Sequence, residues 1–483
     1  MSLEFKAASG VTLVTLAFYL FSASGHLTGQ DQEYFYRTAR AIAREHAFAI
    51  EPIKLGDVEL AGTRGRDGKF YSQYAPGLPV ALAPLVCLAD KLHLPVANIL
   101  PSYHWPFDNP GDIAPRMFVS YFNIPITAMT AGLLTLLVMR LRYPSGAAIF
   151  VALAFALSTF AWGQARIIFV EPLETFLLLA ACVLLIGRSR VAAVVAGFAL
   201  AAATLVKLPS VLALPAFLLL PDEKSETLWR RPSKVLALLI PLAIGLLAYA
   251  WHNWARFGSL FATGYTAASG NIDFDWQPIG GLLGLLFSAG RGLFWFAPLT
   301  ALALFAIKNF YRERPVMARA SIVFAGTWLL FHSFYQSWHA GWGWGPRYLL
   351  PAIPFLLLPL ATLWQSTRGR LLSLGVFALG FAIQIPGAFV DFVESGQSGI
   401  RLFQQTCQDC TAHALHIFWA FRIAGSELVR HTALLFDGKI DIAWLTFHGT
   451  SLPVITFALV AILALCGLAL VLQAIRQAPP IEH

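Results

Sequence analysis

The sequence predicts an all-α polytopic membrane protein with about twelve transmembrane helices and an extracytoplasmic first loop. Of its 483 residues, 57% are hydrophobic and 12% are charged, and the mean hydropathy is +0.65. These values lie far from those of a soluble domain. Apolar runs of the length that a helical span needs, roughly 20 residues, recur along the chain. Cationic residues fall in alternate connections between these runs, as in multi-pass proteins.

The candidate spans are apolar segments bounded by charged or polar residues. They are Ala7 to Ser24, Ile113 to Met139, Ala147 to Trp162, Leu173 to Ile186, Val191 to Leu205, Val211 to Leu220, Val235 to Trp251, Leu293 to Ile307, Ala320 to Phe334, Tyr348 to Trp364, Leu371 to Val390 and Leu452 to Ile475. Several are short for a full span, which predicts broken or tilted helices near a cavity.

Lys and Arg set the predicted orientation, because cytoplasmic loops are enriched in them. The cationic loops contain Arg140 and Arg142, Arg188 and Arg190, Lys224 with Arg230, Arg231 and Lys234, Lys308 with Arg312, Arg314 and Arg319, and Arg368 with Arg370. The connections that then face outward are Asp31 to Asp112, Arg166 to Glu171, His252 to Arg291, Gln336 to Arg347 and Asp391 to Thr450. The N-terminus is therefore expected in the cytoplasm, with the first apolar segment retained as an anchor. The net charge of +8 reflects these cationic cytoplasmic loops, which are expected to be attracted to anionic lipid headgroups. It does not indicate nucleic-acid binding.

Two carboxylates, Asp31 and Glu33, follow the first apolar segment directly. Carboxylates are costly inside hydrocarbon and common at its edge, so this pair is a candidate base or metal site. The alternative is an ordinary helix start, which an acidic first turn also stabilises.

Residues 31–46 have the pattern of an interfacial amphipathic helix, with Arg37, Arg40 and Arg44 directed toward water or lipid headgroups. The glycines that follow predict hairpin turns, at Gly56, Gly62, Gly65 and Gly68.

The segment from Lys69 to Gly77 combines a cation with Tyr71 and Tyr74 next to a Pro-Gly turn. Such a segment can hold a phosphate and a ring, or it can belong to an interfacial aromatic belt.

Further cations lie at predicted helix ends. Lys207 has almost wholly apolar neighbours, so it either snorkels to the interface or binds a phosphate. Arg291 and Arg347 each follow small residues that permit close backbone approach, and simple helix-end anchoring is the alternative for both. Aromatic residues beside Arg347 are a candidate sugar platform or part of a membrane belt, namely Trp338, His339 and Trp342.

The cysteines are informative at one place. Cys407 and Cys410 lie in the last external connection, where an oxidising compartment favours a local disulfide. Free thiols, or a metal site that adds His413 and His416, are the alternatives. The remaining three, Cys87, Cys182 and Cys466, are isolated and are expected to pack as small apolar residues.

The order of segments resembles the GT-C superfamily of polytopic glycosyltransferases, especially bacterial relatives of the protein O-mannosyltransferase and aminoarabinose transferase families. The resemblance spans most of the chain. It rests on Asp31-Gln32-Glu33-Tyr34, Asp67 to Gly77, Arg166 with Glu171-Pro172, Leu205 to Pro209, Asn253 to Ser259, Phe287 to Leu293 and Gly341 to Tyr348. Many such relatives carry a Lys where this chain has Gln73, which shifts expected phosphate binding to Lys69, Lys207 and Arg347.

The resemblance implies an inverting glycosyltransferase that takes a sugar from a polyprenyl-phosphate donor to a lipid, glycan or protein acceptor at the extracytoplasmic face. Asp31 would be the general base, and Glu171 the second catalytic carboxylate, which binds the acceptor or holds Arg166. Donor phosphate would contact Lys69, Arg166, Lys207, Arg291 and Arg347. Substrate would contact Glu33, Tyr34, Tyr71, Tyr74, Trp338, His339 and Trp342.

No cofactor is expected to be required, although Asp31, Glu33 and Glu171 leave a divalent metal open. Residues 1–390 are expected to form the catalytic membrane module, including the 25–112 loop, and residues 391–450 an external subdomain. Residues 451–483 would supply the last span and a cytoplasmic tail. The expected location is the bacterial inner membrane, with the active site in the periplasm. Alternatives are a flippase for a lipid-linked sugar, for which the chain shows no convincing internal repeat, and an oligosaccharide ligase.

Overall fold

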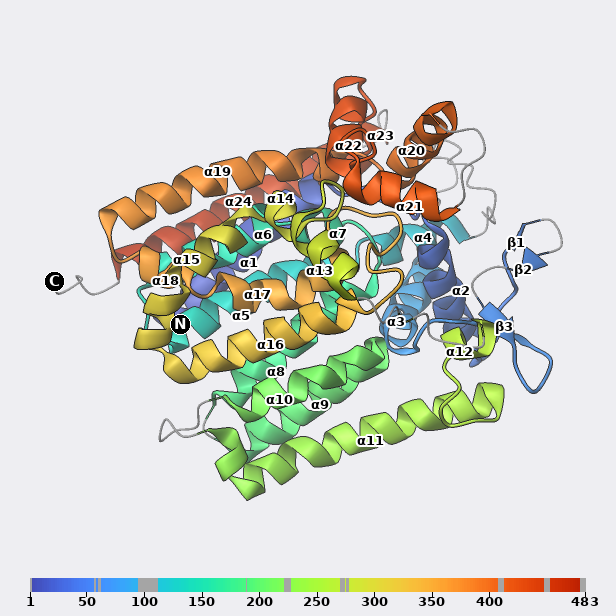
Figure 1. Ribbon diagram of the computed structural model, residues 1–483, viewed down its shortest axis with the longest axis horizontal. Coiled ribbons are helices and arrows are strands. Elements are labelled where there is room, and N and C mark those ends of the chain that lie inside the picture. The colour runs from blue at the N-terminus through green and yellow to red at the C-terminus, as the bar shows by residue number, and fades with distance from the viewer. Residues whose placement is uncertain are drawn as a thin grey trace.

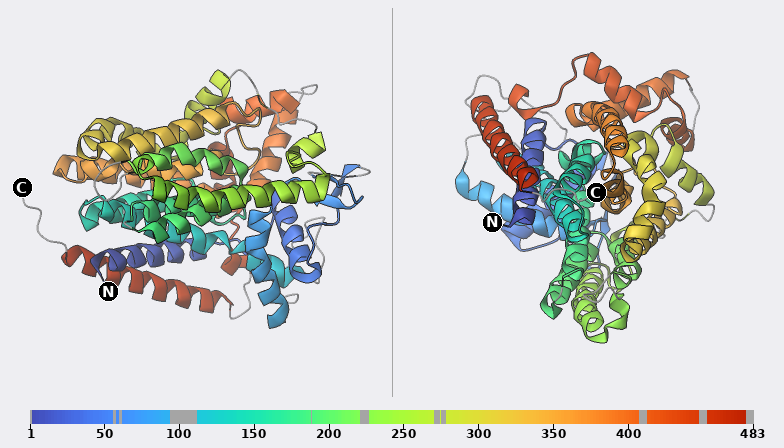
Figure 2. Two further views of the ribbon diagram at one scale, coloured as in Figure 1. Left: turned by 90° about the horizontal axis from the view of Figure 1, so that it is seen from below. Right: turned by 90° about the vertical axis from the view of Figure 1, so that its left-hand side faces the viewer.

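The computed structural model is a bundle of long helices with two small β-hairpins at one end (Figure 1). It describes residues 2–55, 58–59, 62–93, 112–187, 189–220, 227–269, 274, 278–406, 412–446 and 452–477. The long helices run in one general direction, whereas α2 and α3 lie across the end of the bundle that also carries the hairpins (Figures 1 and 2).

The membrane bundle contains long helices and the shorter helical segments that join them. They are α1 (Leu3–Phe21), α4 (Ile113–Ser120), α5 (Asn123–Arg140), α6 (Ser145–Leu157), α7 (Ala161–Ala165), α8 (Val170–Leu185), α9 (Arg190–Val206), η3 (Leu208–Ala213), α10 (Leu214–Leu218), η4 (Leu228–Arg230), α11 (Pro232–Phe257), α13 (Pro278–Phe287), α14 (Leu293–Phe296), α15 (Pro298–Glu313), α16 (Pro315–Ser333), η5 (Arg347–Ala352), α17 (Ile353–Leu357), α18 (Leu360–Leu363), α19 (Thr367–Phe389) and α24 (Leu452–Arg476).

The remaining elements lie in the connections between these helices. They are α2 (Gln30–Glu45), α3 (Gly77–Leu92), α12 (Gly264–Ser269), α20 (Phe392–Thr406), α21 (Ala412–Phe421), α22 (Glu427–Phe436), α23 (Ala443–Thr446), and the strands β1 (Lys54–Leu55), β2 (Val58–Glu59), β3 (Gly62–Arg64) and β4 (Phe70–Ser72). Strands β3 and β4 pair antiparallel with Thr63 opposite Tyr71, so the predicted hairpin is confirmed there.

The predicted class, an all-α polytopic membrane protein, is confirmed. Six helices of the described residues are long and apolar enough to cross a membrane: Leu3–Phe21, Ile113–Arg140, Pro232–Phe257, Pro315–Ser333, Thr367–Phe389 and Pro453–Arg476. Each of the twelve predicted segments falls on helix, and several shorter ones are broken as expected. The segment Arg347–Leu363, for example, is divided into η5, α17 and α18. The apolar helix α13 was missed.

Close packing of small residues joins α1 to α24. A Cβ atom added at Gly10 would lie 2.9 Å from the Gly467 carbonyl oxygen, and one added at Gly467 would lie 2.8 Å from the backbone nitrogen of Val14. At the far end of the pair, Lys6 Nζ donates to Gln477 Oε1 over 3.1 Å. The last span therefore runs antiparallel to the first and belongs to the same bundle.

The first long connection begins with the predicted helix, α2, and its arginines form ion pairs with acidic side chains. Arg37 Nε lies 2.7 Å from Glu33 Oε1, Arg40 bonds Asp112, and Arg44 bonds both Asp90 and Asp112. Asp112, just before α4, holds Arg40 and Arg44, and Asp90 of α3 holds Arg44, whereas Arg37 pairs with Glu33 one turn earlier in α2. The contact of these arginines with water or headgroups stays a prediction.

Candidate active site

Asp31 occupies the first turn of α2, where backbone N–H groups favour an acidic side chain. Its Oδ1 accepts a hydrogen bond of 2.6 Å from the Tyr74 hydroxyl, and its Oδ2 lies 3.6 Å from Arg347 Nη2. About a third of the Asp31 side chain, 32%, is exposed. Burial and the adjacent carboxylate raise the pKa of Tyr74, so the phenol keeps its proton and acts as the donor. Asp31 is thus an oriented carboxylate that solvent can still reach.

Arg347 is held by a tightly bent segment before η5. Gly341, Gly343 and Gly345 have φ values of +64°, +144° and +69°. Residues other than glycine rarely adopt such values. The bend brings the Ala340 carbonyl oxygen 3.1 Å from Arg347 Nε, and the guanidinium carbon lies 3.8 Å from the centroid of the Phe169 ring. The other edge of the guanidinium, which carries Nη2, therefore faces Asp31.

Glu171 and Lys207 meet where α8 begins and α9 ends. The helix α9 stops at Val206 because Pro209 cannot continue it, and Lys207 adopts an extended backbone. Lys207 Nζ lies 3.1 Å from Glu171 Oε1 and 4.2 Å from the Tyr348 ring centroid. Pairing is required here because an isolated buried charge is very costly.

Tyr348 connects the Asp31–Arg347 pair to the Glu171–Lys207 pair. It follows Arg347 directly in the chain, and its ring lies against the Lys207 ammonium. We call Asp31, Tyr74, Glu171, Lys207, Arg347 and Tyr348 the Asp31 cluster. Its members come from α2, the segment after β4, α8, the end of α9 and η5. The predicted residues Asp31, Glu171, Lys207, Arg347 and Tyr74 are thus brought together.

Glu174 and Ser210 were missed by sequence reasoning. Glu174 Oε2 lies 4.0 Å from Lys207 Nζ, and Ser210 Oγ donates to Glu174 Oε1 over 2.6 Å. The signal was present, since Glu171 and Glu174 are three residues apart and share a face of α8. Oε2 of Glu171 and of Glu174 is buried and accepts no hydrogen bond within the described part of the chain.

Arg166 and Arg291 lie outside this cluster. The Arg166 guanidinium donates to the Val390 carbonyl oxygen over 2.9 Å and to Asp441 Oδ2 over 2.8 Å. The suggestion that Glu171 holds Arg166 is therefore wrong. Arg291 donates to Glu427 Oε1 over 2.6 Å and to the Gly343 carbonyl oxygen over 2.6 Å. Asp441 and Glu427, from the connection between α19 and α24, thus engage both arginines. Arg291 also contacts the bend that carries Arg347.

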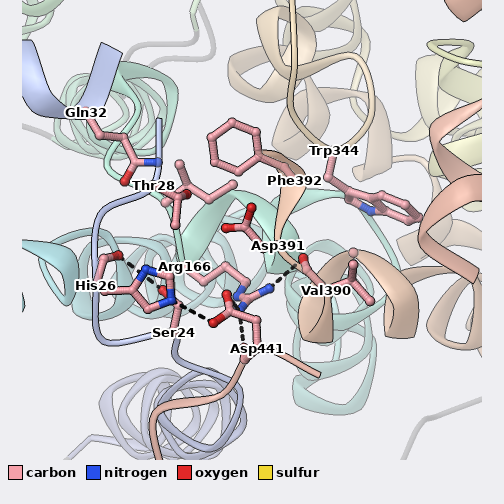
Figure 3. A pocket seen from close by; sticks show the side chains of 12 residues that line it. Ser24, His26, Thr28, Gln32, Arg166, Trp344, Val390, Asp391, Phe392 and Asp441 are labelled. Carbon is pink, nitrogen blue, oxygen red and sulfur yellow. Dashed lines mark hydrogen bonds and ion pairs between the residues drawn. The ribbon is translucent and has the colours of Figure 1, made fainter. Parts of the chain in front are cut away.

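A polar pocket is lined by Arg166, Asp391 and Asp441, and Figure 3 shows the Asp441 carboxylate between Arg166 and His26. His26 Nε2 lies 2.7 Å from Asp441 Oδ1. Burial disfavours the charged imidazole, but Asp441 outweighs burial and raises the pKa of His26. Phe392 lines the pocket and packs against Phe169, which also contacts Arg347. The pocket residues Gln32 and Phe392 thus border elements that carry the Asp31 cluster.

Glu33, which was predicted to contact substrate, is buried in an ion-pair network. Arg37 Nε lies 2.7 Å from Glu33 Oε1, and Arg116 Nη2 lies 2.9 Å from the same oxygen. Since two guanidinium groups occupy the carboxylate, its position favours the packing of α4 on α2 over a contact with substrate.

The residues of the first loop that were predicted to contact donor or substrate differ in their exposure to solvent. Lys69 is exposed at the tip of the β3–β4 hairpin, and its backbone amide donates to Asp67 Oδ1 over 3.1 Å. The Tyr71 hydroxyl donates to Asp67 Oδ2 over 2.8 Å, and burial together with Asp67 raises the pKa of Tyr71 to about 12. Tyr34 is fully buried, 6.4 Å from Phe70 between ring centroids. Neither Lys69 nor Tyr71 is grouped with Asp31 by these contacts.

The predicted aromatic platform flanks the bend before Arg347. Trp338 packs over Gly284, Trp342 packs over Gly396, and the His339 ring stacks 4.3 Å from that of His416. Burial, then the neighbouring His416, lowers the pKa of His339 to about 3, so its imidazole is neutral at ordinary pH. These side chains tie the bend to α13, α20 and α21.

Neither metal binding nor the predicted disulfide is decided by these contacts. Asp31, Glu33 and Glu171 bind different partners, and the described residues contain no group of three His, Cys, Asp or Glu side chains placed to hold a metal ion. Cys407 and Cys410 lie outside the described residues, as does the His413 side chain. Cys87, Cys182 and Cys466 are free thiols, isolated as predicted, but only Cys182 is buried and Cys466 is exposed.

Comparisons with known proteins give two similar folds. No family model and no curated protein match the sequence. Among solved structures, the chain is similar to ArnT from Cupriavidus metallidurans bound to undecaprenyl phosphate, with a TM-score of 0.48, 16% identity, and coverage of 96% of this chain and 75% of that chain. For ArnT of the same organism in the apo state, the TM-score is 0.47 with the same identity and coverage.

Proposed function

We propose that the chain is an inverting glycosyltransferase that moves a sugar from a polyprenyl-phosphate donor to a lipid, glycan or protein acceptor at the extracytoplasmic membrane face. The observation that carries this proposal is the Asp31 cluster. The partly exposed Asp31 carboxylate lies beside the Arg347 guanidinium, and the half-buried Lys207 ammonium lies over the ring of the next residue, Tyr348. These groups come from distant segments of a membrane-spanning chain.

A lipid-linked donor requires cations at the membrane surface, because its phosphate is charged before transfer and gains charge as it leaves. Arg347 can bind two phosphate oxygens at once through its planar fork, whereas Lys207 acts as a point charge. Both cations are largely withdrawn from water, with side chains that are 11% and 18% exposed. Electrostatic stabilisation of the leaving phosphate is stronger in such a setting than at an open surface.

Asp31 supplies the base. In the proposed reaction, the acceptor hydroxyl loses its proton to Asp31 while its oxygen attacks the anomeric carbon from the side opposite the phosphate. The bond between that carbon and the phosphate oxygen breaks, and polyprenyl phosphate leaves with the electron pair. A single displacement of this kind inverts the anomeric centre and needs one base. The Tyr74 hydroxyl fixes the direction of the carboxylate through its 2.6 Å hydrogen bond.

Donor binding and base activation are linked through Arg347. Its Nη2 lies 3.6 Å from Asp31, and a donor phosphate would compete with Asp31 for the same guanidinium. We infer that the donor phosphate replaces Asp31 as the ion-pair partner of the Arg347 guanidinium. Asp31 then keeps only its hydrogen bond with Tyr74, and its second oxygen can accept a proton from the acceptor hydroxyl. Glu171 holds Lys207 with one oxygen, and its second oxygen is available to a sugar hydroxyl.

Reconstitution tests this function. The purified chain in proteoliposomes receives polyprenyl-phosphate sugars with candidate lipid, glycan and peptide acceptors, and the glycosylated product and its anomeric configuration are measured. We expect an inverted product that forms with at least one monophosphate donor.

Two outcomes would replace the proposal. Translocation of the lipid-linked sugar across sealed vesicles without transfer would indicate a flippase. Transfer that requires a polyprenyl-pyrophosphate oligosaccharide would indicate a ligase.

A further inference from the structure

The helix α11 carries an apolar stripe along its whole length. The exposed residues recur every three or four positions, so they share one face of the helix: Leu236, Ile240, Ile244, Leu247, Trp251 and Trp254, with exposed fractions of 58, 58, 54, 70, 63 and 43%. An uncovered apolar face on a membrane-spanning helix contacts lipid chains. Because tryptophan side chains are enriched where lipid chains meet headgroups, Trp251 and Trp254 mark the outer membrane boundary.

The β3–β4 hairpin is fixed to α11 at this boundary. The backbone nitrogen of Arg66 donates to the Arg256 carbonyl oxygen over 2.9 Å, and the Arg66 guanidinium carbon lies 4.3 Å from the centroid of the Trp254 ring. Arg256 Nη1 in turn donates to the Ser72 carbonyl oxygen on β4 over 3.0 Å. The tip of the hairpin therefore has a set height relative to the aromatic boundary.

The tip is strongly cationic. Arg64, Arg66 and Lys69 are all exposed, and within residues 62–72 they are accompanied by one carboxylate, Asp67. The Asp67 carboxylate accepts a hydrogen bond of 2.8 Å from the Tyr71 hydroxyl, so one of its oxygens is directed toward the hairpin. Beyond the end of α11, the Phe261 side chain is 88% exposed. Cations and apolar side chains thus lie together, as on surfaces that bind anionic membranes.

We propose that the tip of the β3–β4 hairpin and the end of α11 form a binding surface for the headgroups of anionic phospholipids in the outer leaflet. The donor lipid carries the same phosphate chemistry, but the cations of the donor site are buried beside carboxylates, whereas those of the hairpin are exposed. Lys69 therefore belongs to the headgroup surface and not to the donor site. This assignment does not depend on the reaction that the Asp31 cluster catalyses.

Site-directed fluorescence quenching tests the surface in the full chain. In a background whose native cysteines are replaced by Ala, Ser259→Cys next to the end of α11 receives a fluorophore, and the protein is placed in nanodiscs. Quenching by headgroup-nitroxide phosphatidylglycerol is then compared with quenching by the matching phosphatidylcholine. We expect phosphatidylglycerol to quench at least about three-fold more strongly at equal mole fraction, and this preference to weaken at high salt.

Charge variants assign the effect to the hairpin. The triple variant Arg64→Gln, Arg66→Gln, Lys69→Gln should bring the quenching ratio to about one. A charge-matched variant with three exposed external cations replaced elsewhere, Arg401→Gln, Arg422→Gln, Lys439→Gln, should keep the preference. Equal quenching by the two lipids in the unmodified hairpin, or a preference that survives the hairpin variant, would overturn the proposal.

Undecaprenyl phosphate separates the two lipid sources. When it is added at one equivalent per protein, we expect no loss of quenching by labelled phosphatidylglycerol. Full displacement at that ratio would make the surface part of the donor site and would overturn its assignment to bulk phospholipid.

Discussion

At the residue scale, charged side chains withdrawn from water form ion pairs with oppositely charged side chains from distant segments of the chain. Glu171 is 2% exposed and Lys207 18% exposed, and they pair over 3.1 Å. When one partner of a buried pair is removed, the remaining charge is left without compensation, which costs about 3–5 kcal/mol. The pair is thus part of the folded structure as well as of the proposed site.

Replacement of Lys207 tests this pairing. Lys207→Met should lower the free energy of unfolding by about 3–5 kcal/mol, because Glu171 and Glu174 then lack a cation. Addition of Glu171→Gln should recover part of the loss, since one of the two stranded charges is removed. Thermal unfolding in detergent measures both, with exposed Lys439→Met as the control. Equal melting temperatures for Lys207→Met and the control would contradict the account.

Tyr74 is predicted to act through Asp31. Tyr74→Phe removes a hydrogen bond to a carboxylate, worth about 1.5–3 kcal/mol, and should reduce kcat roughly 10- to 100-fold with little change in donor KM. Tyr71→Phe is a matched control, because its hydroxyl bonds the exposed Asp67 outside the cluster. Steady-state kinetics with the donor found by reconstitution distinguish the two. Similar kinetics for both variants would remove Tyr74 from its orienting role.

Sequence reasoning selected the residue types of the site more successfully than their partners. Lys207 stood out because an ammonium among apolar residues needs a partner, and Asp31 because it follows the first apolar segment, at the expected edge of the membrane. Arg166 and Arg291 carried the same local signal, but Asp441 and Glu427 engage them from a connection far away in the sequence. No local pattern distinguishes an arginine that awaits a ligand from one that a distant carboxylate will engage.

At the element scale, hydrophobic length predicted where helices lie, and proline and glycine decided where they break. Lys207 reaches Glu171 because α9 ends before Pro209, and Arg347 reaches Asp31 because glycines bend the segment before η5. The apolar helix α13, which has 10 residues, escaped prediction because it lies within residues 252–291, which were assigned to a connection.

Helix contacts in the bundle are testable with glycine. Helix propensity alone predicts that Gly→Ala stabilises a helix by about 0.5–1 kcal/mol. Gly375→Ala in α19 should follow this rule, since nothing lies within 4 Å of its added Cβ. Gly467→Ala in α24 should instead destabilise the protein, because the added Cβ would lie 2.8 Å from the Val14 backbone nitrogen in α1. Melting temperatures that shift in the same direction for both variants would refute this contact.

The connection between α1 and α2 should respond to pH through His26. Asp441 raises the pKa of His26 above its unfolded value of 6.5 despite burial, so the ion pair stabilises fully below that value. This stabilisation is lost as pH rises through the folded-state pKa. The melting temperature of the parent protein should exceed that of His26→Gln most at about pH 6, with a difference that shrinks at higher pH. A difference that grows with pH would contradict the pairing.

At the scale of the whole molecule, the contacts of Asp31 join the Asp31 cluster to α2. The helix α2 lies at the end of the bundle that also carries the hairpins (Figure 1). The cationic loops of the sequence predict that the opposite end is cytoplasmic. In a cysteine-free background in intact cells, an impermeant maleimide should therefore label Lys439→Cys and should label Arg368→Cys only after lysis. The reverse pattern would invert the proposed orientation and remove the site from the extracytoplasmic face.

The central claim is that Asp31 is the base of a glycosyl transfer whose donor phosphate is bound by Arg347. Its most direct test compares Asp31→Asn with the parent protein, and with exposed Asp437→Asn, in donor binding and in transfer from the same donor. Asparagine can still accept the Tyr74 hydrogen bond but cannot accept a proton. We predict donor binding at least as tight as in the parent, because Arg347 loses a competing carboxylate, and transfer reduced about 10²- to 10⁴-fold. Transfer by Asp31→Asn at the rate of the parent would contradict the account.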